Sequence, residues 1–323
     1  MGWRRVLLSG GAVLGAAVTF NAVARRDVPV LGDPLDGEEG WFEWRGHRIA
    51  YSRRGEGSPV LLVHGIHAAA WSWEWHRNAE ALAERHTVYT IDLLGFGRSD
   101  RPAMRYTARL YTALIDDFVA RVIAEPTTLV ANSLSAAYAI VLGARDPARF
   151  PALVLIQPTG LVRLARPSSA GGDVTRLAVD TPIVGTAMFN ALVSRRSLRA
   201  YLEEVYVDHA LVTDDMVEAY YDTAHQPGAR HAPAAFIAGQ LNLDVRHALR
   251  RLVQPALLVW GEQAVQAPVE EARGFLALKP DFALAVLEPA ADLPHDERAD
   301  EFNKVVLAFL ERAERPRGLG ARG

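Results

Sequence analysis

Short, uninterrupted apolar segments alternate with helical stretches through most of this chain. The apolar runs at 59–63, 87–92 and 127–131 are each five or six residues long, which is the usual length of a strand buried on both faces. Stretches with helical periodicity at 73–85 and 111–124 separate them. Strands and helices that alternate at this spacing predict the α/β class, with a mostly parallel sheet and helices on both of its faces.

The alternation stops between residues 159 and 250 and then resumes. Helical patterns dominate this segment, and core strands are expected again at 256–260 and 283–287. We therefore predict a helical cap inserted into an α/β core. The expected organisation is an apolar N-terminal anchor or signal segment at 1–26, a linker at 27–40, the first part of the core at 41–158, the cap at 159–250, the second part of the core at 251–311 and a loose tail at 312–323.

An uncharged run from Val6 to Ala24 lies between two arginine pairs near the N-terminus. It is 19 residues long, at the lower edge for a membrane-spanning helix, and Gly, Ser, Thr and Asn dilute its apolar character. Residues 22–24 (A-V-A) also fit a signal-peptidase site, although arginines directly after it would resist export. We predict membrane attachment through residues 6–24 or an export signal, and hence a membrane-associated or exported protein. A cytoplasmic-side anchor, and a leader that only packs on the domain, remain open.

Composition and charge exclude several classes of function. The net charge is −3, so there is no basic field to attract nucleic acid. The chain contains no cysteine, which excludes disulfides, thiolate metal sites and a cysteine nucleophile. It has no H-E-x-x-H, no P-loop and no G-x-G-x-x-G after a strand. We therefore expect no metal, nucleotide or flavin cofactor, and the sequence indicates no particular oligomeric state.

Four motifs follow strands in a characteristic order. Residues 62–65 (L-V-H-G) end the first core strand, 92–100 (D-L-L-G-F-G-R-S-D) follow the second, 131–135 (A-N-S-L-S) join a strand directly to a helix, and 259–262 (V-W-G-E) end a later strand. With the inserted cap, this order resembles the α/β-hydrolase superfamily, within it the capped esterases, haloalkane dehalogenases and carbon–carbon bond hydrolases. The resemblance covers roughly residues 41–310.

The resemblance implies that Ser133 is a nucleophile at a sharp strand-to-helix turn, the nucleophile elbow. Such a turn needs small residues two positions either side of the nucleophile, and the usual glycines are replaced here by other small side chains. The elbow comprises Ala131, Asn132, Ser133 and Ser135. The oxyanion hole would use the backbone N–H groups of Ile66 and Leu134.

Two of the three members of the usual catalytic triad are missing from their matched positions. The acid expected after the strand-end Gly261 falls on Ala264, and the alternative acid position at the end of the preceding core strand is Gln157. The catalytic histidine of the family's G-H-x-P-H pattern matches Asp292, and His295 matches the second histidine, which is usually structural. The resemblance therefore implies an elbow serine without its standard base.

Several side chains are candidates to replace that base. His67 lies on the loop that borders the site, His295 is three residues from the lost histidine, and His225 and His231 flank a turn in the cap. Each also has a structural interpretation, such as capping a helix or facing solvent. Burial under an apolar cap would raise the pKa of Asp292, which could then transfer protons, or this residue has simply drifted and is solvated.

Three functions remain open from the sequence. The first is a serine hydrolase that acts through Ser133 and a non-standard base on an apolar ester or related hydrophobic small molecule. The second is a non-hydrolytic lyase or isomerase that uses Asp292 and the oxyanion hole. The third is a catalytically degenerate binding protein, because this fold supports all three.

Overall fold

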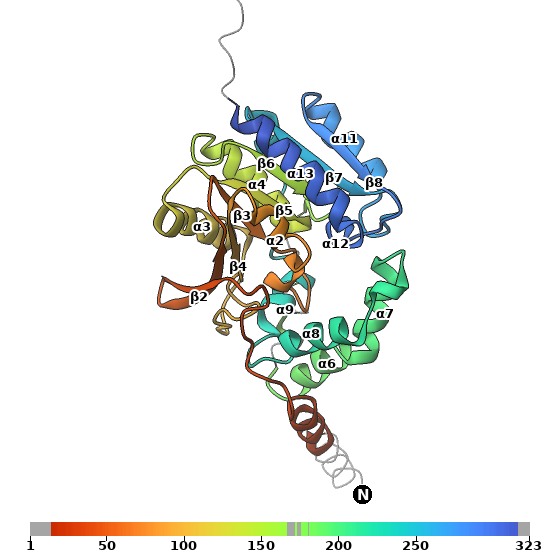
Figure 1. Cartoon of the computed structure of the whole chain (residues 1–323). Coiled ribbons are helices and arrows are strands. Elements are labelled where there is room, and N and C mark those ends of the chain that lie inside the picture. Colours follow the sequence, from red (N-terminus) through yellow and green to blue (C-terminus); the bar gives the residue numbers. More distant parts are fainter. Residues whose placement is uncertain (1–13, 167–171, 173–175, 180, 316–323) are drawn as a thin grey trace, which may run out of the picture.

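One eight-stranded sheet forms the centre of the computed structural model, which describes residues 14–166, 172, 176–179 and 181–315 (Figure 1). The strand order is β1-β2-β4-β3-β5-β6-β7-β8. β2 pairs antiparallel with both β1 and β4, and the remaining pairs are parallel. The strands are β1 (Glu38–Trp44), β2 (His47–Arg54), β3 (Pro59–Val63), β4 (Thr87–Ile91), β5 (Thr128–Asn132), β6 (Leu153–Ile156), β7 (Ala256–Gly261) and β8 (Ala283–Leu287).

Helices and short helical turns connect these strands. They are η1 (Ser72–Trp75), α2 (Ala79–Ala83), α3 (Ala108–Phe118), η2 (Val119–Ile123), α4 (Ser133–Arg145), α6 (Val184–Leu192), α7 (Arg195–Val205), η3 (His209–Leu211), α8 (Asp214–Ala224), α9 (His231–Ile237), α10 (Arg246–Arg251), η4 (Val269–Glu271), α11 (Ala272–Leu278), α12 (Pro294–Glu297) and α13 (Ala299–Glu314). The predicted α/β-hydrolase fold, a mostly parallel sheet with helices on both faces and a helical cap, is confirmed. β1 begins at Glu38, inside the segment predicted as a linker.

Side chains that alternate along the central strands enter two separate cores. In β3, Leu61 and Val63 join the core formed with α3, α4, α10 and α11, whereas Val60 and Leu62 join the core formed with α2 and α13. All five residues of β3 are buried, because helices cover both faces. The continuous apolar runs of the sequence therefore have a direct structural cause.

Among the described helices between β6 and β7, α6, α7, α8 and α9 form the cap. The first three share a hydrophobic core of their own, whereas the buried residues of α9 belong to the larger core beside the sheet. Leu202, Val217 and Tyr220 belong to this core, and two residues from loops of the α/β core, Ala69 and Leu293, join it. In Figure 1 these helices lie together on one side of the sheet. The cap is thus attached to the α/β core by apolar packing as well as by the chain.

The N-terminal segment requires a correction. In the described part of the chain, no helix is long and apolar enough to cross a membrane, which contradicts the predicted membrane-associated or exported protein; residues 1–13 lie outside the described residues. Residues 14–24 are helical, and polar groups in this stretch bond to the cap. Asn21 donates to the carbonyl of Ile183 and accepts from Asn190, and the Tyr221 hydroxyl donates to the carbonyl of Ala24. Asn21, one of the polar residues that dilute the run, therefore serves contacts within the protein.

Candidate active site

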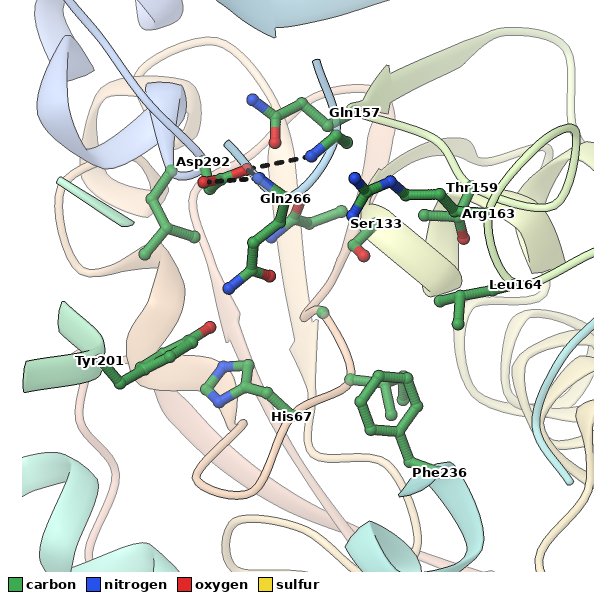
Figure 2. A pocket seen from close by; sticks show the side chains of 15 residues that line it. His67, Ser133, Gln157, Thr159, Arg163, Leu164, Tyr201, Phe236, Gln266 and Asp292 are labelled. Carbon is green, nitrogen blue, oxygen red and sulfur yellow. Dashed lines mark hydrogen bonds between the residues drawn. The ribbon is translucent and has the colours of Figure 1, made fainter. Parts of the chain in front are cut away.

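A cavity of about 610 Å³ lies where the loops after β3, β5, β6, β7 and β8 meet the cap (Figure 2). The carboxyl ends of parallel strands share one edge of a sheet, so these loops converge. Tyr201 of α7 and Phe236 of α9 close the cavity from the cap side. The lining residues are Gly65, Ile66, His67, Asn132, Ser133, Gln157, Thr159, Arg163, Leu164, Tyr201, Phe236, Gln266, Ala267, Asp292 and Leu293.

The turn between β5 and α4 has the geometry of a nucleophile elbow. Ser133 is the first residue of α4 and has a φ of 54°, in the left-handed region that non-glycine residues seldom adopt. Ala131 and Ser135 are buried on either side of it, and the Ser135 hydroxyl donates a 2.6 Å hydrogen bond to the carbonyl of His64. The small flanking residues therefore allow the turn, and one of them ties it to the loop after β3.

Ser133 presents its hydroxyl to the cavity without a base beside it (Figure 2). Within the described ranges, no side chain makes a hydrogen bond with the Ser133 hydroxyl. Leu134 is the second residue of α4, so its N–H is one of those at the helix start that have no partner within the helix. Ile66 lines the same cavity. The two predicted oxyanion-hole positions and the serine thus lie together.

Glu74, a buried carboxylate that the sequence analysis missed, connects the loop after β3 to the elbow. Glu74 Oε2 accepts a 2.9 Å hydrogen bond from the N–H of Gly65, and Oε1 accepts one of 2.9 Å from the side chain of Asn132. His295 Nε2 lies 3.5 Å from the same Oε1. Burial would raise the pKa of Glu74, but the neighbouring His295, with smaller contributions from His64 and His67, holds it below its usual value. One ionised carboxylate therefore links the loop after β3 to the elbow.

Two of the histidines that the sequence analysis considered have structural surroundings. His295 is fully buried, packs against the rings of Trp75 and Phe302, and does not line the cavity. His225 bonds through Nδ1 to the carbonyl of Tyr221 and stacks on that ring, also outside the cavity. His231 starts α9 and is likewise absent from the cavity lining.

His67 is the one histidine of the described residues that lines the cavity. Its Nδ1 accepts a hydrogen bond of 3.3 Å from the N–H of Ala69, and its ring stacks on Tyr220 at 5.5 Å between centroids. Burial lowers the pKa of His67 to about 4, against a smaller opposing effect of Glu74. The imidazole is therefore neutral at physiological pH, although no hydrogen bond joins it to Ser133.

Asp292 lines the cavity but turns its carboxylate toward the loop after β7 (Figure 2). It accepts hydrogen bonds from three consecutive backbone N–H groups, those of Val265 at 3.1 Å, Gln266 at 2.9 Å and Ala267 at 3.3 Å. Burial raises the pKa of Asp292, as the sequence predicted, while these three hydrogen bonds oppose part of the rise. The carboxylate is therefore fixed in place and buried, rather than drifted and solvated.

The two positions where the family places its acid have other roles. Gln157 follows β6 with a φ of 41° and donates a 2.9 Å hydrogen bond to the carbonyl of Ala291, next to Asp292. Ala264 is buried in the loop three residues after the end of β7. Ser133 and Gln157 directly follow the adjacent strands β5 and β6, and strained backbone of this kind is typical of functional sites.

Several further residues of the cavity were not predicted from the sequence. Arg163 forms a 3.2 Å ion pair with Glu271, and Tyr201 and Phe236 come from cap segments far from the motifs. Gln266 lies four residues after the motif at 259–262. Only the folded chain brings these segments together, so no local signal identifies them. Glu74, in contrast, is a carboxylate inside the aromatic run W-S-W-E-W, and that pattern could have marked it.

A second, smaller cavity of about 260 Å³ adjoins the first. His67, Tyr201 and Phe236 line both cavities, and we call the smaller one the side chamber. Its remaining lining is Ala68, Ala69, Leu192, Val193, Ser197, Leu198, Pro233 and Ile237. The side chamber is therefore almost entirely apolar. Among the described residues, no cluster of three or more His, Asp or Glu side chains could hold a metal ion.

Comparisons with known proteins place the chain in a family. The model of the Alpha/beta hydrolase family matches residues 60–305, and the chain belongs to that family. The 2-hydroxy-6-oxo-6-(2'-aminophenyl)hexa-2,4-dienoic acid hydrolase of Metapseudomonas resinovorans is 26% identical over 83% of this chain and 89% of its own length. An uncharacterized protein of Mycobacterium tuberculosis is 24% identical, with 83% and 80% covered.

A solved structure agrees with this assignment at the level of the fold. The crystal structure of a serine hydrolase involved in carbazole degradation matches with a TM-score of 0.71 and 24% sequence identity, and the match covers 85% of this chain and 98% of that one. This similarity shows the fold of the chain and does not identify a substrate.

Proposed function

We propose that this protein binds an apolar carbonyl compound beneath its cap and does not hydrolyse it by triad chemistry. The observation that carries the proposal is the Ser133 hydroxyl, which faces the cavity with no described base in hydrogen-bond contact. A serine hydroxyl can donate to a carbonyl oxygen, and so can the N–H groups of Ile66 and Leu134. The site thus offers carbonyl binding without an activated nucleophile.

The surroundings of Asp292 support this choice over lyase or isomerase chemistry. A proton-transfer group must approach the reacting atom in a suitable pose. Three backbone N–H groups hold the carboxylate of Asp292 toward the loop at 265–267. The apolar side chamber, with Phe236 at its boundary, adds room for a hydrophobic substituent of the ligand.

A slow serine hydrolase is the second candidate, and the backbone at Ser133 favours it. The left-handed conformation at this residue is the kind of strain that persists at catalytic positions. Several relatives are hydrolases by name, among them the dienoic acid hydrolase of Metapseudomonas resinovorans. The two candidates differ in one measurable property, the reactivity of the Ser133 hydroxyl.

Labelling and binding together test the proposal. With a fluorophosphonate probe we expect Ser133 to react orders of magnitude more slowly than the serine of an active esterase measured in parallel. Titration calorimetry with 4-phenylbutan-2-one should show binding that weakens about 5-fold in Ser133→Ala, the loss of one hydrogen bond.

The matched control is Ser135→Ala, since that hydroxyl bonds to the carbonyl of His64 and does not line the cavity. Its affinity for the ketone should stay close to that of the wild type. Rapid labelling that disappears in Ser133→Ala would overturn the proposal and support the serine hydrolase.

A further inference from the structure

The side chamber opens to the surface of the cap. Leu192 and Ile237, the last residues of α6 and α9, line the side chamber and are 55% and 49% exposed. Ala69, Val193 and Leu198 also line it, and all three are buried. Exposure therefore falls from a rim, formed by Leu192 and Ile237, to a buried floor.

The inner end of the side chamber joins the main cavity. His67, Tyr201 and Phe236 line both cavities, and in Figure 2 all three rings lie below Ser133. Burial lowers the pKa of His67 to about 4 and raises the pKa of the Tyr201 hydroxyl, so neither side chain is charged at neutral pH. The join between the two cavities is thus bordered by uncharged rings, which favour contact with an apolar group.

The walls of the side chamber offer a ligand almost no hydrogen bonds from side chains. Among the residues that line the side chamber alone, Ser197 has the one polar side chain. Its hydroxyl forms a 2.9 Å hydrogen bond with the Ser194 hydroxyl and donates one of 3.2 Å to the carbonyl of Ala191. Water in such a space has few partners, and an apolar group that displaces it gains affinity. The side chamber therefore suits a hydrocarbon.

The main cavity has the opposite character. It contains the Ser133 hydroxyl, and the polar side chains of Arg163 and Gln266 line it at exposed positions. A ligand that fills both cavities therefore has its polar end near Ser133 and its apolar end toward the rim. A methylene chain is the narrowest apolar group that can span the join between them.

We propose that the side chamber binds a linear alkyl chain, and hence that the ligand of this protein is a long-chain carbonyl compound. The carbonyl group is held at Ser133, and the chain passes His67, Tyr201 and Phe236 and ends near Leu192. This inference rests on the proposed function and deepens it by naming the substrate class.

A series of methyl ketones tests the effect of chain length. In the wild type, calorimetry should give a Kd for decan-2-one at least about 30-fold lower than for hexan-2-one, since each buried methylene group strengthens binding by up to about 4-fold. Ala68→Phe places a ring in the side chamber from a residue that does not line the main cavity. It should leave the Kd for hexan-2-one nearly unchanged and reduce the ratio to below about 5, because the added methylene groups are no longer buried. Ala210→Phe, at an exposed position outside both cavities, should keep the wild-type ratio.

The chain contains no cysteine, so a single introduced thiol can locate the alkyl chain. A ketone at ten times its Kd leaves the site free for about a tenth of the time, so decan-2-one should slow the reaction of Leu192→Cys with N-ethylmaleimide at least about 5-fold. Hexan-2-one at the same occupancy should not slow it. Met188→Cys is the matched control, because Met188 lies one turn earlier in α6, is 56% exposed and does not line the side chamber. Neither ketone should change its rate.

The outcomes separate the inference from the proposed function. If the two ketones bind the wild type equally, if folded Ala68→Phe keeps the wild-type ratio, or if decan-2-one protects Leu192→Cys no better than Met188→Cys, the inference is wrong while the proposed function stands. If neither these ketones nor 4-phenylbutan-2-one bind, both are wrong. The labelling of Leu192→Cys decides the matter if Ala68→Phe does not fold.

Discussion

The two sides of this site differ in how well their side chains match those expected of a serine hydrolase. On the nucleophile side, Ser133 of the elbow after β5 has a φ of 54°, and Glu74 links Gly65 of the loop after β3 to Asn132. On the base side, the loops after β7 and β8 contain Ala264 and Asp292 where an acid and a histidine are expected. The turn that presents the serine and the side chains expected to activate it therefore belong to different sides of the site.

Rebuilding the base side should give the largest effect. The double variant Ala264→Asp with Asp292→His restores both missing side chains, and we expect fluorophosphonate to label Ser133 at least about 100-fold faster than in the wild type. The measurement is the pseudo-first-order labelling rate followed by intact mass.

The matched control for this rebuild is Ala264→Asn with Asp292→His, which has nearly the same shape but lacks the orienting carboxylate. It should gain much less. If a folded double variant is labelled no faster than the wild type, restoring the acid and the histidine does not activate Ser133. The proposed difference between the two sides would then be wrong.

The brace behind the nucleophile side should have a large effect on stability. Glu74→Ala leaves the N–H of Gly65 and the side chain of Asn132 without their buried acceptor. We expect the free energy of unfolding to fall by about 3 kcal/mol, the usual cost of breaking a buried charged network. Urea denaturation measures it. Glu80→Ala, whose side chain is 80% exposed, should change stability by less than about 0.5 kcal/mol, and equal losses in the two variants would contradict the bracing role.

The neutral His67 should make the free energy of unfolding depend on pH, and we expect this effect to be smaller than that of Glu74→Ala. The folded pKa of His67 is about 4, below the ordinary value of 6.5, so its contribution to stability is fully present above pH 6.5 and is lost as the pH falls toward 4. His67→Phe keeps an aromatic ring against Tyr220 and cannot be charged.

We expect His67→Phe to reduce the loss of stability between pH 6.5 and 4 by about 2 kcal/mol, measured by denaturation at several pH values. His209→Phe, at an exposed position, should leave that loss unchanged. A variant at position 67 with the acid sensitivity of the wild type would show that His67 titrates normally and that the cavity around it is wet.

The nucleophile side was predictable from the sequence because its signals are local. A buried strand, a serine between small residues and a helix define the turn at Ser133 without any information about the rest of the chain. The apolar runs defined the sheet for the same reason. The predicted membrane anchor was wrong, since no described helix is long and apolar enough to cross a membrane. Asn21 of this segment bonds to the cap instead, and no local pattern reveals such a contact.

For the base side, the sequence predicted only that the usual acid and histidine are absent from their matched positions. The sequence identified Asp292 at the histidine position and predicted that burial would raise its pKa, but the direction of its carboxylate depends on the N–H groups of 265–267, which are set by the path of another loop. Arg163 and Tyr201 reach the cavity from segments with no motif. Such convergence is a property of tertiary packing and not of residue spacing.

The left-handed backbone at Ser133 bears on how this molecule can change. For a residue with a side chain, this conformation costs on the order of 1 kcal/mol, whereas glycine adopts it freely. A glycine at position 133 would thus make the turn more stable, but it would remove the hydroxyl. The chain has serine at this position, and the backbone already presents its hydroxyl to the cavity. Reactivity of that hydroxyl can therefore be gained or lost by substituting neighbouring side chains, without a change in the backbone.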